Sequence, residues 1–312
     1  MSAVAAVAVV LLTLAGPPSA PRLAGNTVGR RVAPCRAPLP LLRKSPKLQA
    51  ALERGISKAR LGKYLKRHKL SVAVVDLTDD DRVSYAGLND NTMMYAASVP
   101  KIAALLSVVS AVEAGKLTWS DEMQTRLSSM IVHSSNEDAS WAVDQVGLAA
   151  IESTMRDARY CLYDDTYGGL WIGRAFRSGG EVNRDPHFDI THGATARQAA
   201  RFYAMLARGA LVTPAWSERL LGLMAPPMLH HKFVAALEKR PGLTFLARKS
   251  GSWRTYHADS ALIEHNGRRY AVTALADSKH GEELMRAVAE IADDAVLRTS
   301  PSRTLASAAW VH

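Results

Sequence analysis

A hydroxyl and an amine stand three residues apart where an apolar segment begins in this 312-residue chain. The hydroxyl belongs to Ser98 and the amine to Lys101, and Ala, Val, Leu and Ile dominate the residues that follow, as far as Ala114. Residues three apart in a helix lie on one face. Burial lowers the pKa of a lysine towards the neutral amine that acts as a base. The pair therefore predicts a serine nucleophile whose proton is taken by a lysine.

Two further short motifs follow in the chain. Ser134-Ser135-Asn136 is expected in a turn between two helices, and Lys249-Ser250-Gly251 is expected on a strand. Each motif also has a purely structural interpretation, since Ser98 would serve as a helix N-cap and Ser and Asn are common in turns. Their order and placement are what favour chemistry, because S-x-x-K, S-D-N and K-T-G mark class A β-lactamases and penicillin-binding proteins.

On these motifs the chain resembles a class A β-lactamase-like serine hydrolase of the penicillin-recognising superfamily, and most of all its "serine hydrolase" branch. The resemblance runs from about Leu70 to Leu297. The stretches His230-His231-Lys232-Phe233 and Lys249 to Asp259 are also typical of that branch. The resemblance implies a hydrolase that forms an acyl-enzyme on amide or lactam bonds, with β-lactams or D-alanyl peptides as substrates.

The motifs suggest a role for each catalytic residue. Ser98 attacks a carbonyl and becomes acylated, while Lys101 takes its proton directly or through water. The resemblance implies that Ser134 relays a proton to the leaving nitrogen and that Asn136 hydrogen-bonds the substrate amide and Lys101. Lys249 adds positive charge, which binds a substrate carboxylate and favours deprotonation nearby.

The K-S-G strand is expected to hold the substrate. Ser250 would hydrogen-bond the same carboxylate, and Gly251 would let the substrate approach the strand closely. The N–H of Ser98, at a helix N-terminus, and the N–H of Ser252, at the strand edge, would form an oxyanion hole.

The sequence departs from class A β-lactamases where deacylation is concerned. Those enzymes carry an E-x-x-x-N loop whose glutamate activates the deacylating water, and no such motif occurs between Asn136 and Thr195. Glu181 is the one glutamate in the later part of that segment, with Asp185 rather than Asn four residues on. Glu181 is therefore the candidate deacylation carboxylate, and rapid turnover of β-lactams is in question.

The order of expected elements predicts an α+β fold. Strands at both ends of the chain would form one antiparallel sheet flanked by helices, with an all-helical lobe inserted between them, as in the β-lactamase/transpeptidase-like α/β/α sandwich. A long irregular loop is expected from Arg159 to Gly193. Helices are expected at 46–67, 99–114, 121–133, 136–146, 196–208, 214–224 and 281–297, and strands at 70–77, 82–87, 243–251, 259–264 and 269–276.

These elements divide the chain into segments. Residues 1–20 fit a signal peptide, although no Lys or Arg precedes the apolar run, and this predicts a periplasmic or secreted protein. A linker (21–45) precedes the hydrolase domain (46–298), and a tail (299–312) follows it. The sheet part comprises 46–97 and 240–298, and the helical lobe 98–239. A disordered apolar N-terminus or a misassigned start codon is the alternative to export.

Composition excludes several classes of protein. The net charge of +10 comes from scattered Lys and Arg, so no nucleic-acid partner is expected, and the first apolar run is too short for a stable membrane span. The isolated cysteines Cys35 and Cys161 favour two free thiols, with a disulfide as the alternative for an exported protein. The histidines lack ligand spacing, so no metal or cofactor is expected.

Two other functions remain open on the sequence alone. One is a D,D-peptidase or esterase on the same scaffold. The other is a non-catalytic cell-wall-binding module, for which peptidoglycan would be the partner. The joint presence of Ser98, Lys101, Ser134 and Lys249 argues against the second, because a binding module has no need for all four.

Overall fold

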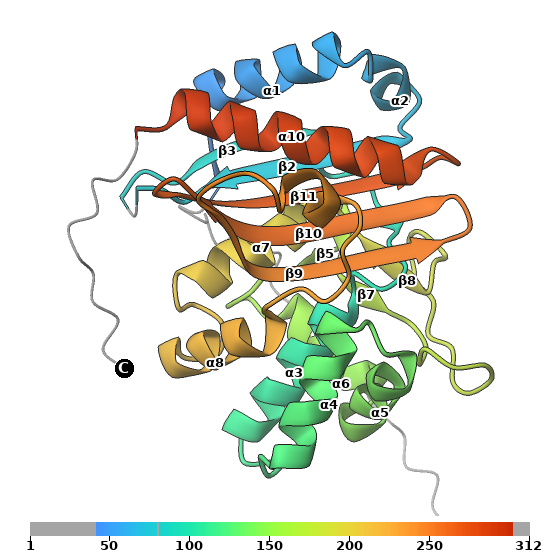
Figure 1. The fold of residues 1–312 in the computed structure, drawn as a ribbon. Coiled ribbons are helices and arrows are strands. Elements are labelled where there is room, and N and C mark those ends of the chain that lie inside the picture. Colours follow the sequence, from blue (N-terminus) through green and yellow to red (C-terminus); the bar gives the residue numbers. More distant parts are fainter. Residues whose placement is uncertain (1–41, 80, 302–312) are drawn as a thin grey trace, which may run out of the picture. The chain divides into compact units, whose positions relative to one another are not determined.

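A six-stranded sheet forms the centre of the molecule in the computed structural model, which describes residues 42–79 and 81–301. The strand order is β1-β3-β2-β11-β10-β9, and the strands come from both ends of the chain (Figure 1). Every pairing is antiparallel except that of β1 with β3. The strands are β1 (Arg43–Lys44), β2 (Leu70–Asp76), β3 (Ser84–Leu88), β9 (Leu243–Trp253), β10 (Tyr256–His265) and β11 (Arg268–Asp277).

Strand β2 explains how the sheet joins two hydrophobic layers. Every residue of β2 is buried, and successive side chains of a strand point to opposite faces. Val72 and Val74 pack into the cluster on one face, while Ala73 and Val75 pack into the cluster on the other. A continuous apolar run therefore reflects a strand covered on both sides.

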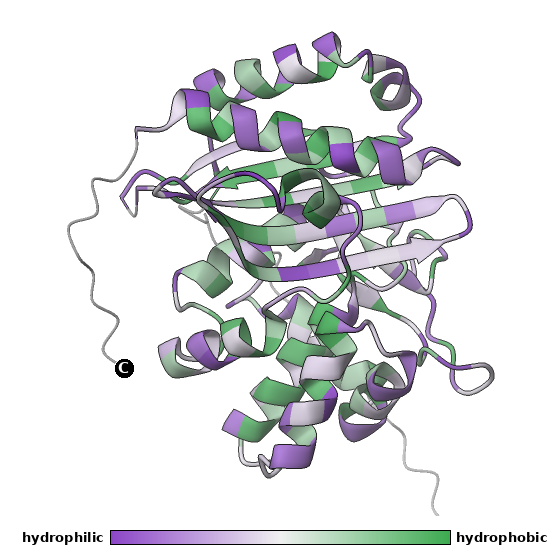
Figure 2. Ribbon diagram, viewed as in Figure 1, coloured by the Kyte–Doolittle hydropathy of each residue, from purple (hydrophilic) through white to green (hydrophobic). Residues whose placement is uncertain are grey.

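The first face of the sheet is covered by helices from both ends of the described chain. Helices α1 (Pro46–Lys58) and α10 (Gly281–Thr299) lie above the sheet in Figure 1, with the short α9 (Phe233–Leu237) beside them. Along α10 hydrophilic and hydrophobic residues alternate, as expected for a helix with one buried face (Figure 2). Helix α1 begins after Ser45, whose Oγ accepts a hydrogen bond from the Leu48 N–H.

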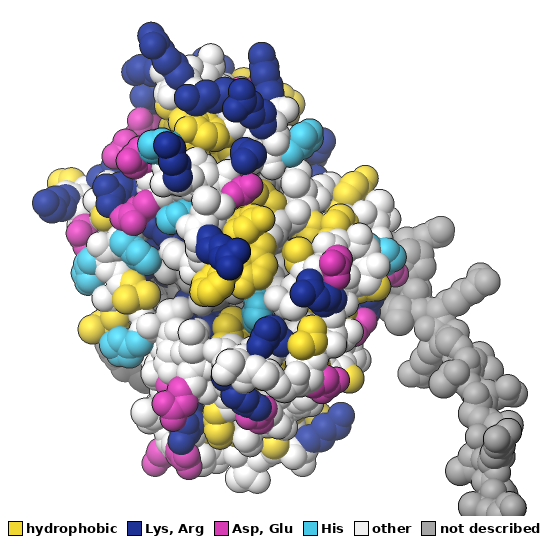
Figure 3. Space-filling model, turned by 90° about the vertical axis from the view of Figure 1, so that its right-hand side faces the viewer, with side chains coloured by type: hydrophobic (Ala, Val, Ile, Leu, Met, Phe, Trp, Pro, Cys, Tyr) yellow, Lys and Arg dark blue, Asp and Glu magenta, His cyan; other side chains and the backbone are white. Residues whose placement is uncertain are grey.

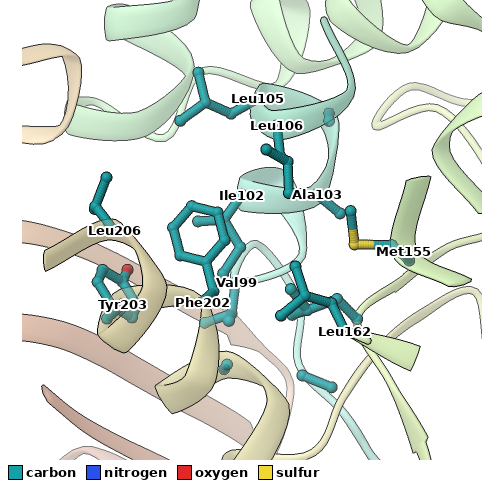
Figure 4. Packing of buried hydrophobic residues seen from close by; sticks show 14 of the residues in the cluster. Val99, Ile102, Ala103, Leu105, Leu106, Met155, Leu162, Phe202, Tyr203 and Leu206 are labelled. Carbon is teal, nitrogen blue, oxygen red and sulfur yellow. The ribbon is translucent and has the colours of Figure 1, made fainter. Parts of the chain in front are cut away.

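The other face carries the helical lobe, which comprises α3 (Lys101–Glu113), α4 (Asp121–Val132), α5 (Asn136–Val146), α6 (Leu148–Arg156), α7 (Ala196–Ala207) and α8 (Pro214–Met224). Its centre is α3, whose first nine residues are all buried. Figure 4 shows Val99, Ile102 and Leu106 packed against Phe202 of α7 and Leu162. This packing fixes the start of α3, and with it Ser98 and Lys101, to the rest of the molecule.

The structure confirms the predicted α+β architecture and corrects several of its details. The expected helix 46–67 is broken at Arg60, whose φ of +57° no helix interior adopts, and it continues as α2 (Gly62–Lys66). Part of the expected linker forms β1. Helices α6 and α9 were not expected. The expected irregular loop contains β5 (Tyr163–Asp164), β6 (Gly168–Gly169), β7 (Trp171–Ile172) and β8 (His192–Ala194), and β8 also pairs with β4 (Met94–Tyr95).

The cysteine prediction is also corrected. Cys161 is buried after α6 and is disulfide-bonded, where two free thiols were favoured. Spacing in the sequence carries no information on the pairing of two distant cysteines, which is why the prediction was wrong. Cys35, the predicted signal peptide, most of the predicted linker and nearly all of the tail lie outside the described residues.

Candidate active site

Ser98 lies in a turn between β4 and α3 and is half-buried. The turn is attached to β8 by the Ala96 N–H, which donates to His192 O at 2.8 Å. Ala97 has a φ of +51°, a region that alanine rarely adopts, so the backbone is strained directly before Ser98. Within the described residues, neither the Ser98 N–H nor its Oγ makes a hydrogen bond. Both groups are therefore available to a ligand.

Lys101 is fully buried one turn further on, and four acceptors surround its amine. Its Nζ donates to Ser134 O at 2.6 Å, Asn136 Oδ1 at 2.8 Å and Ser135 O at 3.0 Å, and it lies 3.4 Å from Ser134 Oγ. Burial lowers the pKa of Lys101 to about 7, with the Asp138 carboxylate partly opposing the shift. A substantial fraction of this amine is thus neutral near pH 7 and able to accept a proton.

The turn that holds Ser134 joins α4 to α5. Ser134 has a φ of +59°, and the Oγ of Ser135 caps α5 by accepting from the Asp138 N–H at 3.1 Å. Lys249 of β9 reaches this turn and donates from Nζ to Ser134 Oγ at 2.8 Å. Burial, and then the nearby charge of Lys101, hold the pKa of Lys249 well below its usual value. Ser134 thus lies between two lysines of lowered pKa.

Strand β9 brings the K-S-G motif against the Ser98 turn. A Cβ on Gly251 would lie 2.4 Å from Ala96 O and 2.6 Å from Ser98 N, so only glycine allows this approach. β9 is the edge strand of the sheet, with β10 as its one neighbour. Ser252 follows at the exposed end of β9, while buried Ser250 shares a hydrogen bond of 3.0 Å with His231 Nε2. The Gly251 backbone therefore lies directly against the Ser98 amide, and Ser252 is the next residue along β9.

A cleft of about 520 Å³ opens beside Ser98 and Ser252. Ser98, Asn136 and Ser252 line it together with Trp253, whose side chain is 55% exposed at the rim. On the side of the molecule that carries the β9–β10 turn, basic and hydrophobic side chains are interspersed (Figure 3). The remaining lining comes largely from the segment before β8: Arg174, Ala175, Phe176, Arg177, Arg184, Asp189, Ile190 and Thr191.

That segment places an aromatic ring, not a carboxylate, beside the buried amine. The centroid of the Phe176 ring lies 4.8 Å from Lys101 Nζ, and the His192 ring packs against Phe176 at 4.4 Å. Burial lowers the pKa of His192 to about 4, so this neighbour is neutral near pH 7. Glu181 is exposed and is not among the residues that line the cleft. The structure thus brings Ser98, Lys101, Ser134, Asn136, Lys249, Ser250, Gly251 and Ser252 together, and it leaves Glu181 apart.

Sequence reasoning missed two residues of this site. Phe176 stands in a segment without periodicity, so no pattern placed it against Lys101. Lys232 belongs to a stretch noted for its resemblance, yet nothing in the sequence showed that its amine is fully buried against the end of β9. The position of Phe176 beside Lys101 and the burial of the Lys232 amine both depend on tertiary packing, so sequence motifs do not reveal them.

Among the described residues there is no cluster of three His, Cys, Asp or Glu side chains able to hold a metal ion. The described helices also include none that is both long and apolar enough to cross a membrane.

The fold, with hydrogen bonds connecting the S-x-x-K, S-x-N and K-S-G motifs beside Ser98, is that of a penicillin-recognising serine hydrolase. A model of the family described as "Beta-lactamase enzyme family" matches residues 51–298, and the chain belongs to this family. It is therefore a hydrolase of the β-lactamase-like type. No curated protein matches the chain.

Solved structures show the same fold at low sequence identity. PBP-A is 18% identical over 83% of this chain and 99% of its own, with a TM-score of 0.61. The β-lactamase from Sphaerobacter thermophilus DSM 20745 is 15% identical over 81% of this chain and 99% of its own, with a TM-score of 0.60. TLA-3 extended-spectrum β-lactamase is 16% identical over 80% and 98%, with a TM-score of 0.63.

Proposed function

We propose that this protein forms an acyl-enzyme at Ser98 with β-lactams or with D-alanyl peptides and esters. The observation that carries the proposal is the hydrogen-bonded group beside Ser98, in which Ser134 Oγ lies 3.4 Å from Lys101 Nζ and 2.8 Å from Lys249 Nζ. A buried amine of lowered pKa, a relay hydroxyl and a second cation are the parts that acyl transfer from an amide requires.

In the proposed acylation, the neutral amine of Lys101 accepts the Ser98 Oγ proton as Oγ attacks the carbonyl carbon. The oxyanion of the tetrahedral intermediate accepts hydrogen bonds from the Ser98 and Ser252 N–H groups. The C–N bond then breaks, and the leaving nitrogen takes the Ser134 hydroxyl proton. The Lys101 ammonium returns a proton to Ser134, so that the amine is neutral again at the end of the step.

The substrate is held on the β9 side of the cleft in this proposal. The Lys249 amine, whose protonated form the negative charge of the substrate carboxylate favours, binds that carboxylate together with the Ser250 hydroxyl. Asn136 hydrogen-bonds the side-chain amide of the substrate. His231 supports the orientation of Ser250, because the two side chains share a hydrogen bond of 3.0 Å. The positive charge of Arg174 and Arg177 in the cleft lining further favours an anionic substrate.

We further propose that the acyl-enzyme is long-lived, as in a penicillin-binding protein or D,D-peptidase acting on a slow substrate. The Phe176 ring lies 4.8 Å from Lys101 Nζ, where it offers no group to activate water. A variant of PBP-A, solved as an acyl-enzyme complex with penicillin G, shares 19% identity with this chain and has a TM-score of 0.61. This supports slow release on such a scaffold, and the D,D-peptidase is the second candidate function.

The proposal includes the setting of the protein. We propose export to the periplasm or medium through a signal peptide at residues 1–20, a hydrolase domain at 46–298 and the cell wall as the surroundings of the substrate. Sequencing of the mature N-terminus checks this, since a start near Pro21 is expected, whereas an intact Met1 in a cytosolic protein contradicts it.

The mass of the intact protein during incubation with penicillin G tests the catalytic proposal. We expect an adduct of one penicillin that persists for minutes or longer, localised to Ser98 by peptide mapping, and its absence in Ser98→Ala. Rapid turnover without an accumulating adduct would instead indicate a fast β-lactamase. If penicillin, D-alanyl peptides and esters all fail to react at Ser98, the proposal is wrong and a binding module remains.

A further inference from the structure

A third buried lysine lies beside the cleft and has no place in the acylation scheme. Lys232 precedes α9, is fully buried, and donates from Nζ to Gly251 O at 2.5 Å, Ser252 Oγ at 2.8 Å and Ala258 O at 3.0 Å. Within the described residues, no carboxylate accepts a hydrogen bond from this amine. Its cation is thus directed at backbone carbonyls and at one hydroxyl of the K-S-G-S segment.

The amide that Lys232 contacts is the one expected to bind the oxyanion. The Gly251 C=O and the Ser252 N–H belong to a single peptide group, which is planar and resonance-stabilised. In a trans peptide the C=O and the N–H point in opposite directions. When the Lys232 amine binds the Gly251 oxygen, the Ser252 N–H therefore points away from the lysine. A positive charge at the oxygen draws electron density from the nitrogen and makes the N–H a stronger donor. Gly251 meanwhile keeps this peptide against Ser98 N, since a Cβ there would lie 2.6 Å from that atom.

The buried position of Lys232 is energetically unfavourable for two reasons. A buried ammonium to which no carboxylate hydrogen-bonds is costly to desolvate, although the charge of Asp259 partly offsets this, and Lys232 also has a φ of +54°. The next amide, Phe233 N–H, donates to Asp259 Oδ2 at 3.1 Å, and Arg248 binds the same carboxylate at 2.7 Å. Arg248 also donates to His231 O at 3.0 Å, so the chain on both sides of Lys232 is fastened to β9 and β10.

We propose that Lys232 is a positioning residue of the oxyanion hole, which orients and polarises the Gly251–Ser252 peptide so that the Ser252 N–H stabilises the oxyanion. The inference rests on the proposed acylation at Ser98. Burial lowers the pKa of Lys232 to about 8, which leaves most of the amine charged near pH 7. Lys232 touches neither the substrate nor the reacting atoms; it acts through the backbone.

The test compares Lys232→Met with wild type in acylation by penicillin G and in binding of phenylboronic acid, which forms a tetrahedral anion with a serine hydroxyl. We expect the acylation rate constant to fall about tenfold, a fraction of the effect of deleting a whole oxyanion donor. Affinity for the boronate should fall by a similar factor, while affinity for the hydrolysed, planar product is unchanged. The carbonyl stretch of the acyl-enzyme should move to higher frequency as its hydrogen bond weakens.

A matched control separates this role from a structural one. Leu237→Ala removes a buried side chain from α9, close to Lys232, and destabilises the fold without touching the Gly251 peptide. It should lower the melting temperature and leave boronate affinity and carbonyl frequency at the wild-type values. Lys232→Arg, which keeps the charge, should restore most of the acylation lost in Lys232→Met.

If Lys232→Met does not fold, Lys232→Gln carries the test, because its amide keeps a donor for Gly251 O but no charge. We expect a loss of threefold or more in acylation. Acylation, boronate affinity and carbonyl frequency equal to wild type in either neutral variant overturn the inference, as does a change of the same size in Leu237→Ala. A wild-type protein that is never acylated at Ser98 overturns the proposed function instead, so the two failures are distinct.

Discussion

The two walls of the cleft differ in the kind of groups they hold. On the acylation side, formed by the Ser98 turn, the Ser134 turn and the end of β9, buried polar groups are connected by hydrogen bonds of 2.6–3.4 Å. On the loop side, formed by residues 173–191, the ring of Phe176 faces Lys101, Glu181 is exposed, and the buried Asp185 accepts hydrogen bonds from the His187 and Phe188 N–H groups. This difference between the two walls is consistent with the proposal that the acyl-enzyme forms readily and is released slowly.

Backbone strain occurs on both sides of the cleft. Ala97 and Ser134 on the acylation side have positive φ values, and so does Asp189 on the loop side. Such residues persist only where surrounding packing determines the backbone. For Ala97 and Ser134, the packing comes from α3, whose first turns are buried, and from β9. Strand β9 approaches the Ser98 turn so closely that only glycine fits at position 251. The acylation side is therefore supported by the core of the protein.

The largest effect on the acylation side, short of removing the nucleophile, is expected from Lys101→Met. Loss of a general base lowers the acylation rate by about 10³-fold. In wild type the neutral amine is the active form, so acylation should rise with pH, level off above the Lys101 pKa of about 7, and fall tenfold per unit below it. Stopped-flow acylation by a chromogenic β-lactam measures the rate constant of the variant and the pH profile of the wild type. A variant within tenfold of wild type, or a flat pH profile, would show that Lys101 is not the base.

Gly251→Ala should separate the two halves of the acylation side. The new Cβ would meet Ala96 O at 2.4 Å and Ser98 N at 2.6 Å, so β9 must move away from the Ser98 turn. We expect acylation to fall about 10²-fold as one oxyanion donor is displaced, and stability to fall by about 1–3 kcal/mol. Acylation kinetics and thermal unfolding measure the two losses.

Gly222→Ala is the matched control for this change. Gly222 lies in α8, where an added Cβ has no atom within 4 Å, and it is remote from the Ser98 cleft. Alanine in a helix interior is favoured over glycine by about 0.5–1 kcal/mol, so this variant should be slightly more stable and fully active. Equal kinetics in the two variants would mean that the close approach of β9 is unimportant.

Phe176→Glu tests the loop side by giving it the carboxylate that it lacks. A base placed near Lys101 should accelerate deacylation by at least about tenfold. The same negative charge raises the pKa of Lys101, so acylation near pH 7 should slow. Phe176→Gln has the same shape without the charge and should show neither change. The lifetime of the penicillin adduct is measured from the intact mass of each variant. Equal lifetimes in Phe176→Glu and Phe176→Gln contradict the role given to Phe176.

Much of the acylation side could be predicted from the sequence because its parts are local. Ser98 and Lys101 are three residues apart, Ser134 and Asn136 two apart, and Lys249 to Ser252 consecutive, so helix, turn and strand geometry carry them. Their mutual approach followed from the order of the elements. The antiparallel sheet made from both ends of the chain was likewise predictable from the order of the apolar, strand-like segments.

The remainder depended on long-range packing. The position of Phe176 is set by contacts with His192 and Lys101, neither of which a period in the sequence encodes. Short strands such as β5 and β6 hold only two residues each, too few for an alternation to be recognised. Helix α9 follows a residue in the left-handed region and has only five residues. The disulfide of Cys161 is fixed by tertiary structure alone.

The smallest effect is expected from Glu181→Gln, and it bears directly on the contrast between the two walls. Glu181 is the glutamate that the sequence offers for deacylation, yet its side chain is exposed and does not line the cleft. Exposed substitutions typically change free energies by no more than about 0.5 kcal/mol, so the adduct lifetime should change by about twofold at most. Asp189→Asn serves as the comparison, since Asp189 is the one acidic residue among the described residues lining the cleft. A tenfold longer lifetime in Glu181→Gln alone would mean that the segment closes over the acyl-enzyme and brings this glutamate to it, and the loop side would then hold its base after all.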